Sequence, residues 1–208
     1  GLGHNVAGSE VPIQHLVVFV HGLGVNGAVH GTALEHAAAA APQGTRVVRS
    51  KANTAAGAEG PAWGTMWLTL GGVVAGGQRL AVEIRQLVGD TGATEVSLVG
   101  GSMGGLFCRQ AICELQDLKV TWRSFITLAT PHLGGVPRSW AAFFAAWTIT
   151  VRDLGWSTPA LPDLCGEEAV AGLSRFRQRV AYAPVVDDGI VAWGTAALSG
   201  GEPEVLDG

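Results

Sequence analysis

The chain has 208 residues, 48% of them hydrophobic, and a formal net charge of −4. A chain of this length and composition buries one sizeable core, so we expect a single domain over residues 1–208. The 13 lysines and arginines include only two lysines and form no basic stripe, which excludes nucleic acid as an expected partner.

In chain order, short β-rich runs alternate with longer helical patterns, which is typical of a parallel sheet covered by helices. The expected strands are residues 16–20, 46–49, 95–99, 124–128 and 178–186. The expected helices are residues 28–41, 73–88 (with Gly89 as its stop) and 103–118, and a short helix begins near Trp193. The predicted fold class is therefore α/β, with a mostly parallel sheet and helices on both faces.

Two stretches interrupt this alternation. Residues 51–71 are rich in Gly, Ala and Thr and predict a loop, whereas residues 134–172 are rich in aromatic residues and proline and predict a small cap insertion. The aromatic residues of this insertion are Trp140, Phe143, Phe144, Trp147 and Trp156. Such a cluster favours either a lid or groove for an acyl chain or a cap helix packed on the core, and the sequence leaves both open.

The strongest motif is Gly100-Gly101-Ser102-Met103-Gly104, a G-x-S-x-G pentapeptide between the third strand and the following helix. This context is that of the nucleophile elbow of α/β-hydrolases, in which a strained turn lifts the serine hydroxyl above the sheet. We therefore expect Ser102 to be a catalytic nucleophile. It needs a base to accept its proton and N–H donors that stabilise the oxyanion of the substrate.

The oxyanion donors are predicted from the same fold. They are the backbone N–H of Met103, which follows the nucleophile, and that of Leu23 in the loop after the first strand. Since the carboxyl ends of parallel strands share one edge of a sheet, we expect this loop, with His21 and Gly22, to line the pocket beside Ser102.

The triad also needs a carboxylate that orients the catalytic imidazole. Asp188 is the preferred candidate because it follows the fifth strand, and Asp187 is the alternative. Both acids also fit an Asx turn or a helix cap exposed to solvent. Asp163 and Glu167 lie in the insertion and are weaker candidates.

Three blocks of the chain resemble the putative serine esterase family of lipase-like α/β-hydrolases found in plants, algae and fungi. They are Leu16–Leu23, Leu98–Gly105 and Phe125–Gly134, of which Thr130-Pro131-His132-Leu133-Gly134 is the most specific. The resemblance implies hydrolysis of carboxylic esters of acyl lipids with no metal or organic cofactor. It also implies that Ser102 is the nucleophile and Asp188 the triad acid, with a catalytic histidine after the acid.

The histidines of this chain, however, all precede Asp188; the last of them is His132. Three interpretations remain open. The chain is shortened at its C-terminus, or His132 substitutes as the base, or the protein is a noncatalytic homologue that keeps the elbow as a scaffold. Histidine in this motif is more often structural, in which case His132 lines the pocket without serving as the base.

We therefore expect a serine esterase or lipase that hydrolyses acyl esters through an acyl-enzyme on Ser102. The alternatives are an acyltransferase that uses the same acyl-enzyme and an inactive lipid-binding homologue. No signal peptide or transmembrane segment is visible, so an intracellular location is favoured, and the apolar insertion is compatible with contact at a membrane interface. The three cysteines lack ligand-like spacing and predict free thiols.

Overall fold

The computed structural model describes residues 12–23, 31–55, 62–135, 148–185 and 191–199. Within these residues, five parallel strands form one sheet in the order β2-β1-β3-β4-β5. The strands are β1 (His15–Val20), β2 (Thr45–Arg49), β3 (Glu95–Gly101), β4 (Thr121–Leu128) and β5 (Gln178–Tyr182). The predicted α/β fold class with a parallel sheet is confirmed.

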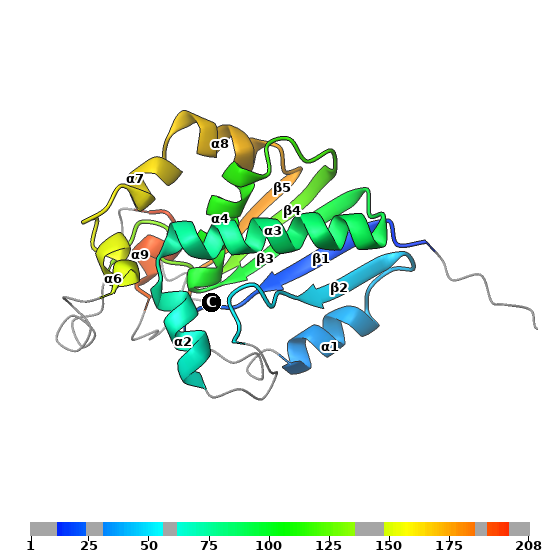
Figure 1. The fold of residues 1–208 in the computed structure, drawn as a ribbon, viewed down its shortest axis with the longest axis horizontal. Coiled ribbons are helices and arrows are strands. Elements are labelled where there is room, and N and C mark those ends of the chain that lie inside the picture. Colours follow the sequence, from blue (N-terminus) through cyan, green and yellow to red (C-terminus); the bar gives the residue numbers. More distant parts are fainter. Residues whose placement is uncertain (1–11, 24–30, 56–61, 136–147, 186–190, 200–208) are drawn as a thin grey trace, which may run out of the picture.

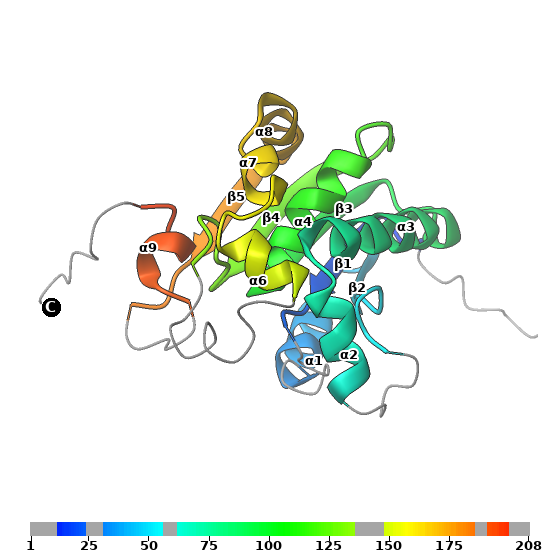
Figure 2. The ribbon, with the colours of Figure 1, turned by 60° about the vertical axis from the view of Figure 1, so that its left-hand side comes forward.

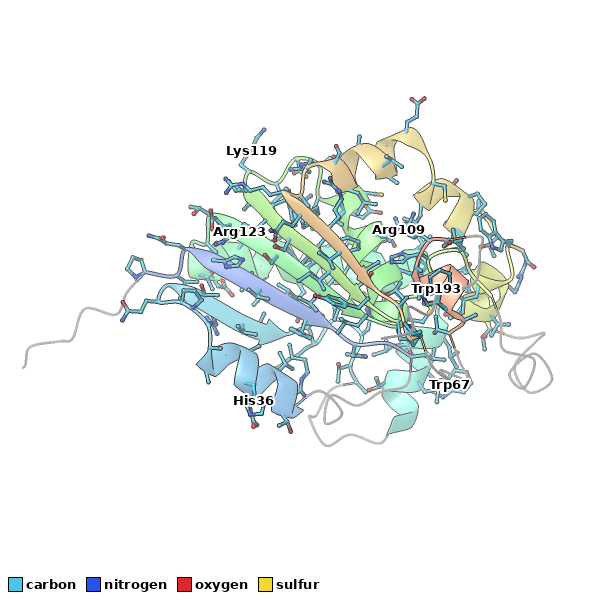
Figure 3. All side chains as sticks on the ribbon, turned by 180° about the vertical axis from the view of Figure 1, so that it is seen from behind. His36, Trp67, Arg109, Lys119, Arg123 and Trp193 are labelled. Carbon is cyan, nitrogen blue, oxygen red and sulfur yellow. The ribbon has the colours of Figure 1, made fainter. Side chains whose placement is uncertain are left out.

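Helices connect these strands. They are α1 (Gly31–Ala39), α2 (Ala62–Leu70), α3 (Val73–Thr91), α4 (Met103–Glu114), α6 (Ile149–Leu154), α7 (Ala160–Leu164), α8 (Glu167–Ser174) and α9 (Trp193–Ala196). Figure 1 shows α3 and α4 packed side by side in front of the sheet, with α8 beside α4. Because parallel crossovers are right-handed, the reversal of strand order after β2 places α1 on the opposite face of the sheet from α3 and α4. Figure 3, drawn from behind, shows the strands in front of these two helices.

The apolar run of β1 predicts a strand that is buried on both faces, and the structure shows an asymmetric burial instead. Leu16, Val18 and Val20 are almost fully buried under α3 and α4, whereas Val17 and Phe19 on the other face are half-buried. Phe19 aligns across the sheet with Val99 of β3. The hydrophobic core therefore lies between the sheet and the α3–α4 layer, where burial of aliphatic side chains contributes most to stability.

Several boundaries differ from the sequence-based predictions. Helix α4 ends at Glu114 and not at residue 118, and β4 begins at Thr121 and not at residue 124. Helix α3 continues through Gly89 and ends at Thr91, and Gly92 adopts the left-handed conformation with φ 67°. The N–H of Gly92 donates to the Val88 carbonyl at 2.9 Å, a helix end that favours glycine. Strand β5 ends at Tyr182 and not at residue 186.

The expected loop over residues 51–71 is wrong in its second half, where α2 forms. Its sequence has no strong amphipathic period, so tertiary contacts fix it. Arg79 of α3 donates through Nη2 to the carbonyl of Leu68 at 2.8 Å, and the same guanidinium bonds the Asn53 side chain. The free thiols predicted for the three cysteines, Cys108, Cys113 and Cys165, are confirmed.

The segment between β4 and β5 holds α6, α7 and α8, and residues 136–147, with Trp140, Phe143, Phe144 and Trp147, lie outside the described residues. Figures 1 and 2 both place α2, α6 and α9 toward the end of the sheet to which the strand arrows point. This carboxyl edge is where parallel α/β sheets form their sites.

Candidate active site

Ser102 lies between the end of β3 and the start of α4 with φ 50° and ψ −129°. A positive φ is costly for a residue with a side chain and persists only where the surrounding structure enforces it. The backbone N–H of Ser102 donates to the carbonyl of Leu128 at 2.8 Å, which fixes the turn to the end of β4. The geometry is that of the strained strand-turn-helix expected from the G-x-S-x-G motif.

The glycines around Ser102 allow α4 to approach the sheet. A Cβ on Gly104 would lie 2.2 Å from the carbonyl oxygen of Val20, and a Cβ on Gly100 would lie 2.5 Å from the backbone of Gly105. Both distances are shorter than real contacts allow, and the neighbouring atoms are backbone. Glycine is therefore needed here for close approach.

The loop after β1 meets the nucleophile, as predicted from the shared sheet edge. A Cβ on Gly22 would stand 2.7 Å from Cβ of Ser102 and 3.1 Å from its Oγ. Leu23, whose N–H is a candidate oxyanion donor, follows directly and is half-buried. The loop after β1 and the turn at Ser102 thus lie against each other, as predicted.

His21 is buried in this loop, with both ring nitrogens in hydrogen-bond contact. Its Nε2 is 2.8 Å from Oγ1 of Thr54, and its Nδ1 is 2.9 Å from the carbonyl oxygen of Gly22. Since a carbonyl oxygen only accepts, Nδ1 carries a proton and donates to Gly22, while Nε2 shares a hydrogen bond with the Thr54 hydroxyl. In this arrangement His21 holds the loop after β1 against the segment after β2.

The segment after β2 is itself fixed by Glu83 of α3. Oε1 of Glu83 accepts the N–H of Lys51 at 2.7 Å, and Oε2 accepts the Ser50 hydroxyl and the N–H of Ala52. Sequence reasoning missed this carboxylate, which lies within the helix predicted over residues 73–88 and is marked by no motif. It supports the site at a distance, through Thr54 and His21.

Met103, the other candidate oxyanion donor, is the first residue of α4 and is buried. The first N–H groups of a helix have no partner within the helix, and the helix dipole places partial positive charge there. The start of α4 therefore directs N–H groups and the positive end of the helix dipole toward the turn at Ser102. Both features would stabilise a developing oxyanion.

His132 is buried, and its ring is bound on both sides. Its Nε2 is 2.9 Å from Oγ1 of Thr127, and its Nδ1 is 3.5 Å from Nη1 of Arg109. Burial, together with the nearby Arg109 charge, lowers the pKa of His132 to about 4. The ring is therefore neutral at pH 7, and its contacts join the end of β4 to α4.

The candidate acids divide into two groups. Asp187 and Asp188 lie outside the described residues. Asp163 on α7 and Glu167 at the start of α8 are both exposed on the surface. Among the described residues, no three His, Cys, Asp or Glu side chains gather as potential metal ligands.

One buried carboxylate was missed from the sequence. Asp153 of α6 is 2% exposed, and its Oδ2 accepts the N–H of Val73 at 2.8 Å. Thr150 of the same helix accepts the N–H of Gly72 at 3.0 Å. Since Gly72 at the N-cap position of α3 has no side chain, α6 supplies the capping groups for this helix. In the sequence, Asp153 is marked only as an acidic residue within an apolar stretch.

Comparison with known families gives a match over nearly the whole described chain. The family described as "Putative serine esterase (DUF676)" matches residues 12–199. This range contains the elbow at Ser102, the loop after β1 and the segment around His132.

Two yeast proteins are similar in sequence. The chain is 36% identical over 139 residues to "Putative lipase ROG1" of Saccharomyces cerevisiae, a match that covers 59% of this chain and 20% of the yeast protein. It is 32% identical over 126 residues to "Putative lipase YDL109C" of the same organism, covering 52% of this chain and 20% of that protein. The match thus spans about a fifth of the length of either relative.

Solved structures show the same fold. Aspergillus fumigatus lipase B superposes with a TM-score of 0.64 at 19% identity, covering 89% of this chain and 41% of the lipase. Bacillus licheniformis lipase BlEst2 superposes with a TM-score of 0.53 at 17% identity, covering 86% of this chain and 70% of the lipase. At these identities the likeness supports the α/β-hydrolase fold alone.

Proposed function

Because this chain belongs to the putative serine esterase family, we propose that it hydrolyses carboxylic esters of acyl lipids through an acyl-enzyme on Ser102. The observation that carries the proposal is the strained backbone of Ser102, at φ 50° between β3 and α4, with Gly22 packed against its side chain. Backbone strain of this kind is concentrated at functional sites, where it helps to position a reacting group.

In the proposed reaction, Oγ of Ser102 attacks the carbonyl carbon of the ester while a general base accepts the hydroxyl proton. None of the described histidines is proposed for this role. The N–H groups of Leu23 and Met103 stabilise the oxyanion of the tetrahedral intermediate. This intermediate collapses and the alcohol leaves with the proton. Water then hydrolyses the acyl-enzyme and releases the carboxylic acid. Asp188 is proposed as the triad acid, which would orient the general base.

His132 is not the proposed base. Its Nε2 contacts Thr127, its Nδ1 faces Arg109, and its neutral ring is enclosed by protein. A general base has to reach the proton that it removes, directly or through one water molecule. His132 is instead proposed as a structural residue behind the site.

Contact with a lipid interface is supported by exposed apolar side chains at the carboxyl edge of the sheet. They are Trp67 on α2, Leu133 after β4, Ile149 on α6, Trp156, and Leu198 after α9. Trp156 and α9 are fixed to the segment after β4, because Trp156 Nε1 donates to Leu133 and Thr195 bonds both Leu133 and Gly134. Figure 3 shows Trp67 and Trp193 on this side of the molecule.

These exposed apolar side chains at the carboxyl edge of the sheet are suited to shallow insertion among lipid headgroups. In the described part of the chain, no helix is long and apolar enough to cross a bilayer.

The test is burst kinetics with p-nitrophenyl octanoate, together with intact mass measurement of the octanoyl adduct. We expect wild type and His132→Ala to show a burst and an adduct, and Ser102→Ala to show neither. Ser174→Ala is the matched control, because Ser174 lies at the end of α8 and its hydroxyl bonds only the local carbonyl of Ala171 among the described residues. An adduct that persists in Ser102→Ala would refute the assignment of the nucleophile. Octanoate ester binding without any adduct in wild type would favour the inactive lipid-binding homologue.

A further inference from the structure

A cavity that does not include Ser102 among its lining residues lies between strands β4 and β5 and helices α4 and α8. Its volume is about 190 Å³. Phe125, Leu173, Val180 and Leu198 supply most of its apolar wall. Cavities of about 150 Å³ with apolar walls bind small hydrocarbons such as benzene. This one is therefore large enough for a short acyl chain.

The polar side chains of this cavity are cationic or neutral. Arg109 and Arg179 line it together with Thr127 and the neutral His132, and no carboxylate is among the described residues that line it. In the described part of the chain, the ion pairs join Arg85 to Asp117 and Arg123 to Glu95, so neither cavity arginine has an acidic partner there.

Arg109 places a fixed positive charge beside the cavity. It is 8% exposed, and its Nη2 donates to the Leu164 carbonyl at 2.6 Å while its Nη1 lies 3.4 Å from the His132 carbonyl oxygen. Its buried Nε has no partner among the described residues, and burial lowers the pKa of the guanidinium. A buried charge whose partners are carbonyls and the neutral His132 ring is costly, and a nearby anion would stabilise it.

Arg179 on β5 is exposed, and it is anchored at one end. Its Nη1 donates to the Phe176 carbonyl at 2.5 Å and lies 3.4 Å from the carbonyl oxygens of Leu173 and Ser174. Among the described residues its Nε and Nη2 have no partner. The guanidinium is thus held at the cavity with two N–H directions available for an incoming oxygen, and charged hydrogen bonds of this kind are about twice as strong as neutral ones.

We propose that this cavity binds a monocarboxylate with a short acyl chain, with the chain along the Phe125–Leu198 wall and the carboxylate on Arg179. Arg109, which also lines the cavity, adds electrostatic attraction for the carboxylate. The cavity matches this ligand in shape and in charge. Its apolar walls suit the hydrocarbon, and its two arginines, which have no acidic partner within the described part of the chain, suit the anion. The site is separate from the proposed nucleophile, so the proposal does not depend on ester hydrolysis.

The experiment uses Ser102→Ala protein, in which no turnover can complicate binding, and isothermal titration with octanoate. 1-Octanol, which has the chain without the charge, and acetate, which has the charge without the chain, are the comparison ligands. We expect octanoate to bind at least about tenfold more tightly than 1-octanol, because a charged hydrogen bond contributes about this factor. Acetate should show no saturable binding.

Two variants on this background locate the site. Arg179→Met should weaken octanoate binding about tenfold or more and leave 1-octanol unchanged. Arg177→Met is the matched control, because Arg177 is also exposed, lies two residues away and does not line the cavity. Ala181→Leu, which adds volume at an exposed position of the lining, should weaken both octanoate and 1-octanol.

The proposal is overturned if octanoate does not bind, if it binds no better than 1-octanol, or if Arg177→Met weakens it as much as Arg179→Met. Octanoate binding that Ala181→Leu leaves unchanged also overturns it. Circular dichroism on each variant confirms folding, and Arg179→Met, an exposed substitution, keeps the test decisive if Ala181→Leu misfolds.

Discussion

Gly22 lies directly against Ser102, so that a Cβ at position 22 would stand 2.7 Å from Cβ of the serine. The same Cβ would stand 3.1 Å from the carbonyl oxygen of Gly101, which belongs to the elbow itself. Any side chain at Gly22 therefore pushes on the turn that presents the hydroxyl. The relationship joins the loop after β1 to the loop after β3.

Gly22→Ala should lower kcat/KM for p-nitrophenyl octanoate by about 100-fold, because a displacement of about 1 Å at a reacting group has an effect of this size. The measurement is steady-state kinetics with a burst to count active sites. Gly89→Ala is the matched control, since its Cβ would meet nothing within 4 Å. It lies inside α3, so it should keep the activity and raise stability by about 1 kcal/mol. Unchanged kinetics in Gly22→Ala would show that the contact does not position Ser102.

The buried ring of His132 predicts a specific pH dependence of stability. The native state keeps the ring neutral down to about pH 4, whereas the unfolded chain takes up a proton near pH 6.5. The unfolded state therefore binds more protons between these values, and the free energy of unfolding falls as the pH is lowered from 6.5 to 4. The loss attributable to this one group is about 3 kcal/mol.

Urea denaturation of wild type and His132→Asn between pH 4 and pH 7 tests this prediction. Carboxylates also titrate at the acid end, so the informative quantity is the difference in slope between the two proteins. His132→Asn should flatten the curve in this range. His36→Asn, which removes an exposed imidazole on α1, is the control and should follow wild type. Parallel curves for wild type and His132→Asn would rule out a buried neutral ring.

Asp153→Ala should destabilise the fold by about 1–3 kcal/mol, because it leaves the N–H of Val73 without its acceptor in a buried position. Asp153→Asn retains an oxygen acceptor and should cost less. Asp163→Ala on the surface of α7 is the control and should change stability by less than about 0.5 kcal/mol. Urea denaturation of the three variants provides the comparison. Equal stability of Asp153→Ala and Asp163→Ala would contradict the capping role of Asp153.

The sequence by itself determined the features that local pattern controls. The G-x-S-x-G motif after a β-branched run predicts the turn at Ser102, and the strands could be predicted because their apolar runs are short and bounded by turn residues. The meeting of the Gly22 loop with Ser102 was also predictable, since parallel strands bring their carboxyl ends to one edge. These inferences need only neighbours in sequence or a general rule of topology.

Tertiary structure alone decided the rest. Local composition does not decide whether Gly89 or Gly92 terminates α3, and the structure places the C-cap at Gly92. Helix α2 forms where its own sequence predicts a loop. The cap of α3 comes from Asp153, 80 residues beyond Val73. The enclosure of His132 needs α4 to pack against the end of β4. Each of these depends on groups far apart in the chain, whose hydrogen bonds and burial exist only once the sheet and its helices have packed.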